Sequence, residues 1–206
     1  MIKKILVILC LVVTPHIAHA EKVQPVQLSL FEPVQLVPAD ESIRGMRLGV
    51  LYTVNKDVSG LSFTWIGVDR VMGEMNGVEI GLVNWADEAA HGGQIGLVNH
   101  AGKRFVGLQY GMVNVTEVDL TGVQWGIVNW AGGCMHGLQA GVVNISKGES
   151  AGLEIGAVNY NEGSFNGLQL GLINYTKSLK GLQIGLANYN GNKKPMEFMV
   201  LANASF

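Results

Sequence analysis

The sequence contains little cysteine and little charge. Only two of its 206 residues are cysteines, and one of them, Cys10, lies in the apolar segment at the N-terminus. Since Cys134 alone remains beyond that segment, the mature chain has no intramolecular disulfide. Charged residues make up 15% of the chain and the formal net charge is −2, which argues against nucleic acid as a partner. No apolar run of 18 residues follows the N-terminal segment, so a helical membrane span is not expected.

Patterns that carry chemistry are also missing. Cys134, Met135 and His136 are adjacent, and His91 occupies the same repeat position as His136. Neighbouring residues of a strand point to opposite faces, however, and the two histidines lie three repeats apart, whereas metal ligands must converge. No His or Asp partner recurs beside Cys134. We therefore expect no metal, no cofactor and no catalytic residue.

The N-terminus has the features of an export signal. Lys3 and Lys4 precede a short apolar run, and Ala18-His19-Ala20 forms an A-x-A cleavage site. This order predicts a secretory signal peptide over residues 1–20. The mature chain would then begin at Glu21 and be exported to the periplasm, the outer membrane or the cell surface.

What the chain has in abundance is repetition. Eight near-copies of G-L-Q-I-G-L-V-N follow one another, with six intervals of 15 residues and a last interval of 14. They open at Gly77, Gly92, Gly107, Gly122, Gly137, Gly152, Gly167 and Gly181. A fixed period of this kind predicts a repeat architecture. Diverged copies extend the pattern toward the N-terminus, so we expect an N-terminal strand and linker over residues 21–44 and a single repeat β domain over 45–206.

Within each copy, numbered from its first glycine, apolar residues occupy positions 2, 4 and 6, with Gly93 at position 2 as the exception. Glycine occupies positions 1 and 5, Gln or Glu occupies position 3, and asparagine always occupies position 8. Alternation with a period of two is typical of a β-strand with one apolar face. The sequence therefore predicts an all-β protein.

Two arrangements of the strands fit this pattern. An antiparallel meander that closes into a shallow barrel pairs apolar positions with apolar positions in every hairpin and places them inside. The alternative is a parallel β-solenoid with 15-residue coils, in which the position-8 asparagines stack into a ladder. We expect the barrel. A barrel of the outer-membrane kind is a further alternative, but positions 2, 4 and 6 span only about 13 Å against the roughly 25 Å of a lipid-facing band.

The repeats resemble a known family. G-L-Q-I-G-L-x-N repeats after a signal peptide, the segment from Val26 to Tyr52 and the closing L-A-N-A-S-F are similar to a family of bacterial secreted surface-repeat proteins. The chain also resembles the β-flower fold, which implies a shallow, symmetric barrel of hairpins with an apolar interior. Membership of the family implies almost no biochemistry.

These observations favour a non-enzymatic protein of the cell envelope or surface that binds a lipid or another apolar ligand. The alternatives are an outer-membrane β-barrel, a purely structural β-solenoid, and an enzyme whose site is assembled from scattered loop residues. The candidate ligand-binding residues belong to the apolar face: Leu82, Leu97, Met112, Ile127, Val142, Ile155, Leu170, Leu172 and Leu186.

Overall fold

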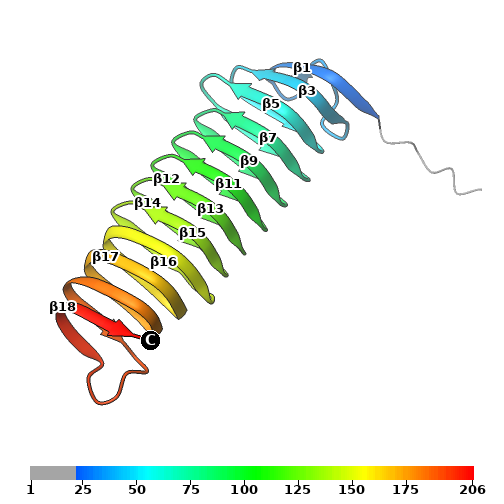
Figure 1. Cartoon of the computed structure of the whole chain (residues 1–206). Coiled ribbons are helices and arrows are strands. Elements are labelled where there is room, and N and C mark those ends of the chain that lie inside the picture. The colour runs from blue at the N-terminus through cyan, green and yellow to red at the C-terminus, as the bar shows by residue number, and fades with distance from the viewer. Residues whose placement is uncertain (1–21) are drawn as a thin grey trace, which may run out of the picture.

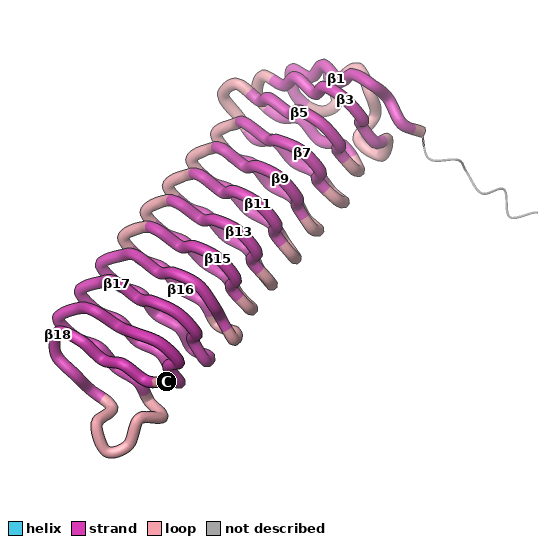
Figure 2. The backbone as a smooth tube through the Cα atoms, in the orientation of Figure 1, coloured by secondary structure: helices cyan, strands magenta, loops and turns pink. Residues whose placement is uncertain are grey.

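The structure, a computed structural model, describes residues 22–206, and the predicted signal peptide lies outside the described residues. The chain winds into a β-solenoid whose coils stack along one axis (Figures 1 and 2). Most coils contain two strands, one on each of two opposite walls. Every strand is part of one 18-stranded sheet, so the described chain is an all-β repeat protein.

The first wall, in front in Figure 1, contains the longer strands. They are β3 (Ser42–Gly49), β5 (Val58–Thr64), β7 (Met75–Ile80), β9 (Ala90–Ile95), β11 (Phe105–Tyr110), β13 (Leu120–Trp125) and β15 (Met135–Ala140). The second wall contains four-residue strands: β4 (Tyr52–Asn55), β6 (Val68–Val71), β8 (Val83–Ala86), β10 (Val98–Ala101), β12 (Val113–Thr116), β14 (Val128–Ala131) and β16 (Val143–Ser146). One long strand, β17 (Ser150–Asn190), continues through the last coils and follows both walls.

Neighbouring coils pair in parallel and in register, so that each repeat position lies beside its own copy. In β11 and β13, for example, Gln109 pairs with Gln124, and in β10 and β12 Asn99 pairs with Asn114. The antiparallel barrel expected from the sequence is therefore wrong, and the parallel solenoid is right. The physical reason lies in the amides, because a primary amide both donates and accepts and so bonds its own copy one coil away.

Two such amide ladders fill the interior. At position 8, each asparagine donates from Nδ2 to Oδ1 of the next, as Asn99 does to Asn114 over 2.8 Å. At position 3, each glutamine donates to the residue at the same position one coil earlier, which is a glutamine for Gln124, whose Nε2 lies 2.7 Å from Gln109, and a glutamate for Gln94 and Gln169. These side chains are fully buried. Since a buried polar group is costly unless it is hydrogen-bonded, the ladders require the stacked register and no other.

The apolar core is correspondingly narrow. It contains position 10, which is alanine in three of the eight copies and polar in the others, and position 14, where Phe105, Leu120 and Met135 stack and Ser150 separates them from Phe165. The sequence prediction placed positions 2, 4 and 6 inside, and this is also wrong. Their side chains point outward, because the interior face of each first-wall strand is the face that carries glutamine.

Both ends of the solenoid are covered by strands of a different kind. At the N-terminus β1 (Val23–Phe31) pairs in parallel with β3, and β2 (Val34–Gln35) folds back against β1. At the C-terminus β18 (Phe198–Ser205) runs antiparallel to the last coil of β17. Lys193, from the loop before β18, donates to Oδ1 of Asn203 at 2.9 Å and to the carbonyl of Ala204 at 2.7 Å. These segments limit the exposure of open sheet edges.

Candidate functional site: an outward apolar face

The outer surface of the first wall is apolar along the whole solenoid. We call this surface the apolar face. It is formed by positions 2, 4 and 6 of successive coils: Met46, Leu48, Leu61, Phe63, Val78, Ile80, Leu82, Ile95, Leu97, Leu108, Tyr110, Met112, Val123, Trp125, Ile127, Leu138, Ala140, Val142, Leu153, Ile155, Ala157, Leu168, Leu170, Leu172, Leu182, Ile184 and Leu186. None of these residues is charged. Since the strands stack in register, like positions form straight rows across the coils.

The candidate residues chosen from the sequence all lie on this face. Eight of them are exposed: Leu82, Leu97, Met112, Ile127, Val142, Ile155, Leu172 and Leu186. Leu170 is half-buried between its neighbours. The structure thus brings the predicted residues together on one surface, but it places them toward solvent and not around an enclosed lumen.

The size of the face sets it apart from an ordinary surface. Five residues of a strand span about 13 Å, and ten coils at a spacing of about 4.8 Å extend over roughly 45 Å. The product is on the order of 600 Å², at the upper limit of apolar patches on soluble monomers. Its side chains are far from buried, since Trp125 is 56% exposed and Leu186 is 62% exposed.

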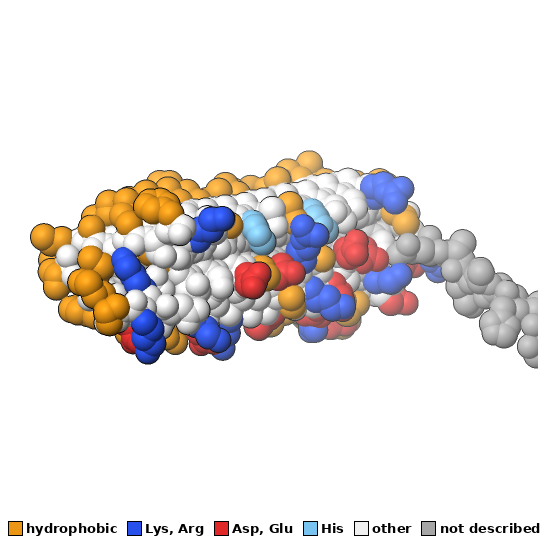
Figure 3. Space-filling view, turned by 60° about the horizontal axis from the view of Figure 1, so that its bottom comes forward, with side chains coloured by type: hydrophobic (Ala, Val, Ile, Leu, Met, Phe, Trp, Pro, Cys, Tyr) orange, Lys and Arg blue, Asp and Glu red, His pale blue; other side chains and the backbone are white. Residues whose placement is uncertain are grey.

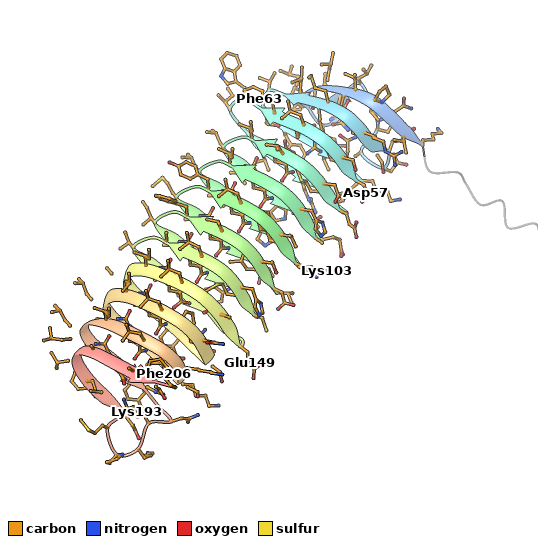
Figure 4. All side chains as sticks on the ribbon, viewed as in Figure 1. Asp57, Phe63, Lys103, Glu149, Lys193 and Phe206 are labelled. Atoms are coloured by element: carbon orange, nitrogen blue, oxygen red, sulfur yellow. The ribbon has the colours of Figure 1, made fainter. Side chains whose placement is uncertain are left out.

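Charged side chains gather elsewhere. Asp57, Lys103 and Glu149 belong to the turns that join the second wall to the first, and Figure 4 shows these residues along one long edge, with Phe63 at the opposite edge. In Figure 3 the Lys, Arg, Asp and Glu side chains spread over the side in view, while hydrophobic side chains line the upper margin and the C-terminal end. The outer surface is therefore divided between an apolar side and a charged side.

Two hollows interrupt the apolar surface. A groove of about 360 Å³ lies at the middle of the face, between the coils that carry Tyr110 and Trp125, and Leu97, Met112 and Ile127 line it. The glycines at position 5 form its floor. A wider hollow of about 590 Å³ lies where the face meets the N-terminal segments. Its walls include Leu28, Leu30, Val34, Leu36 and Leu48.

The second wall carries a row that sequence reasoning misplaced. Strict alternation along one strand predicts that position 9 lies on the same face as the position-3 glutamine, but the chain turns at the corner between the walls and position 9 points outward. Tyr160, Tyr175 and Tyr189 stack there, with ring centroids 4.7 and 5.0 Å apart. Trp85 stacks on His100 at 3.7 Å. These rings cover one another's faces, so the row presents edges to the solvent. The aromatic residue that often follows the position-8 asparagine was the signal in the sequence.

The cysteine–histidine segment lies at the turn edge. Cys134 is a free, partly buried thiol, and it borders a cavity of about 340 Å³ together with His136, Glu149 and Lys180. Within residues 22–206 no group of three or more His, Cys, Asp and Glu side chains is arranged to hold a metal ion. The same part of the chain contains no helix that is long and apolar enough to cross a membrane.

Charge does enter the interior at one point near the N-terminus. Arg47 occupies the position-3 row, where it bonds to Asp69 and lies 3.6 Å from an oxygen of Glu79. All three side chains are fully buried. Burial, and then the neighbouring Asp69 carboxylate, raise the pKa of Glu79 to about 8. At neutral pH the Asp69 carboxylate therefore balances the charge of Arg47, and Glu79 is a neutral acid beside them.

Comparison with known proteins adds no assignment: no protein family, no curated protein and no solved structure matches the chain. The resemblance to secreted surface-repeat proteins stays a prediction, as do the boundaries of the signal peptide and of the repeat domain. What stands is a parallel β-solenoid of repeats of about 15 residues with an uncharged outer face.

Proposed function

We propose that the chain is a non-enzymatic repeat protein of the cell envelope or cell surface that binds a lipid or another apolar ligand on its apolar face. One observation carries the proposal: no charged residue occupies positions 2, 4 and 6 of the successive coils, although these side chains point to solvent. Exposing so many Leu, Ile, Val and aromatic side chains in rows is unfavourable unless a partner covers them.

The rigid ladders support this role. A stack of buried hydrogen-bonded amides fixes the spacing of the coils, so the apolar rows are held in place before a ligand arrives. Preorganised surfaces lose less conformational entropy on binding. The predicted signal peptide supports a location outside the cytoplasm, where an apolar surface meets envelope lipids. Mass analysis of the exported form should give Glu21 as the first residue.

A fluorescent fatty-acid probe tests the proposal. We expect saturable binding to the purified mature protein, and a weaker affinity after Leu97→Thr, Met112→Thr and Ile127→Thr are combined in the central groove. Threonine is well tolerated in β structure, and its smaller, polar side chain removes apolar contact. Val118→Thr is the matched control, since Val118 is 45% exposed in a turn at the opposite edge. If the folded parent protein does not bind the probe, the binding function is wrong and a purely structural role is the remaining interpretation.

A further inference from the structure

The apolar face has to be covered by a partner with a shape that fits it. The face does not end at the edges of the first wall. Between β5 and β6, Trp65 and Ile66 extend the apolar surface around the corner from the first wall to the second, and they are 68% and 53% exposed. At the C-terminal end β18 adds Val200 and Leu201, and Figure 3 shows hydrophobic side chains wrapping over that end. The apolar surface is therefore curved over one corner and one end.

This shape discriminates between two occupants. A second rigid copy would cover a plane and would leave the corner and the end in water. A fluid layer of lipid chains follows a curved surface and covers all of it. We infer that the occupant of the apolar face is the surface of a lipid bilayer, on which the solenoid lies with its long axis parallel to the membrane. This inference rests on the proposed function and names its ligand.

The backbone of the first wall permits such contact. Each strand from β5 to β13 is hydrogen-bonded to the coil before it and the coil after it, as β7 is to β5 and β9. Their peptide groups therefore already have partners within the sheet. Hydrocarbon can approach a surface of this kind without leaving N–H or C=O groups unsatisfied, which is the condition that the membrane interior imposes on a backbone.

The side chains suit the interfacial zone of a bilayer. Tyr110 and Trp125 stand side by side in the middle of the face, and both are more than half exposed. Their rings are apolar bodies with one polar group each, a combination enriched where hydrocarbon meets head groups. Side chains on a rigid sheet reach only a few ångströms outward, so the protein lies on the membrane and does not span it.

The charge distribution indicates which lipids take part. The apolar face carries no Lys or Arg, and the whole chain has a formal net charge of −2. Attraction to anionic lipids normally comes from basic residues close to the membrane surface. We therefore expect binding to neutral phosphatidylcholine, with no gain from anionic lipid and no loss when salt is added.

The chain offers a matched pair of reporters for the test. Trp125 lies on the apolar face, whereas Trp130 lies on the second wall, where the amine of Lys147 sits 4.6 Å from its ring centroid. Two variants of the mature protein would each keep one of these tryptophans and carry phenylalanine at the other three. Both would be mixed with phosphatidylcholine vesicles whose acyl chains are brominated, because bromine quenches indole fluorescence on contact.

The expected result is flotation of both variants with the vesicles and several-fold stronger quenching of Trp125 than of Trp130. Equal quenching of the two tryptophans would overturn the orientation. Binding that requires phosphatidylglycerol and disappears in salt would overturn the apolar mode of attachment. If the protein binds the fatty-acid probe but forms a dimer in sedimentation and never floats, a bilayer is not the occupant of the apolar face, and the proposed function still stands. A folded protein that binds neither would refute both.

Discussion

Gln139 directs its side-chain carbonyl toward the next coil, where Glu154 occupies the place that glutamine holds in most other repeats. The Oε1 atom of Gln139 is buried and has no hydrogen-bond partner. Glu154 accepts from Nε2 of Gln169 at 2.6 Å and from the hydroxyl of Ser146 at 3.0 Å. A neutral carboxyl group at Glu154 would restore the ladder, because its O–H can donate to Gln139. Burial also raises the pKa of Glu154 to about 7 from its ordinary 4.5.

This relationship makes the stability of the protein depend on pH. The folded state favours the neutral acid, so Glu154 contributes stability that is fully present below pH 4.5 and is lost as the pH rises through 7. A shift of this size corresponds to about 3 kcal/mol. Glu154→Gln supplies a permanent donor, and we expect it to raise the free energy of unfolding at pH 8 with little effect at pH 4.5.

Urea denaturation at the two pH values measures the effect. Glu149→Gln, in an exposed turn of the neighbouring coil, is the control for loss of one negative charge. A Glu154→Gln variant that gains no more at pH 8 than at pH 4.5 would contradict a neutral Glu154.

Arg47 and Asp69 form a buried ion pair. Replacing Arg47 alone should therefore lower the free energy of unfolding, and replacing both residues should restore most of it. Arg47→Gln leaves the buried Asp69 carboxylate without its cation, and breaking a buried ion pair in this way costs about 3–5 kcal/mol. Adding Asp69→Asn removes that charge and gives the two coils the Gln and Asn that later repeats carry. We expect the double variant to recover most of the lost free energy of unfolding. Equal instability of the single and the double variant would show that the pair does not act as a unit.

Gly92 and Gly93 are neighbours in the chain, and alanine should destabilise the protein much more at Gly92 than at Gly93. Gly92 has a φ of +121°, and a Cβ there would lie 2.0 Å from the carbonyl oxygen of Gly77 in the previous coil. Alanine at this position therefore meets both backbone strain and a clash, and we expect a loss of about 3 kcal/mol or more. A Cβ at Gly93 would make ordinary contacts with Val78 at 3.7 Å. Thermal melts of the two variants should differ clearly, and similar melting temperatures would refute the close approach of the coils.

The period and the strands could be predicted from the sequence, because they depend on the repeat spacing and on local alternation. The direction of pairing could not, since the antiparallel register also brings position 4 of one copy beside position 4 of the next. The eight asparagines such as Asn144 were the better guide, because only stacking gives identical amides a reason to recur. The orientation of the apolar face was missed for a related reason: amide ladders can fill an interior, which leaves leucines such as Leu97 outside.

Asn144 allows the ladder itself to be tested with little change in side-chain size. Its Nδ2 donates to the carbonyl of Ile155 at 2.9 Å and to Oδ1 of Asn159 at 2.8 Å. Asn144→Asp removes both donors and buries a carboxylate beside two oxygen acceptors, so we expect a loss of about 3 kcal/mol at pH 7. Because the fold would favour the protonated acid, the loss should shrink as the pH falls toward 4, where a neutral carboxyl group regains one donor. Asn166→Asp, on the exposed side of a strand, is the matched control and should change stability little at either pH. If Asn144→Asp were no more harmful than Asn166→Asp at pH 7, the stacked asparagines would not be what holds the coils in register.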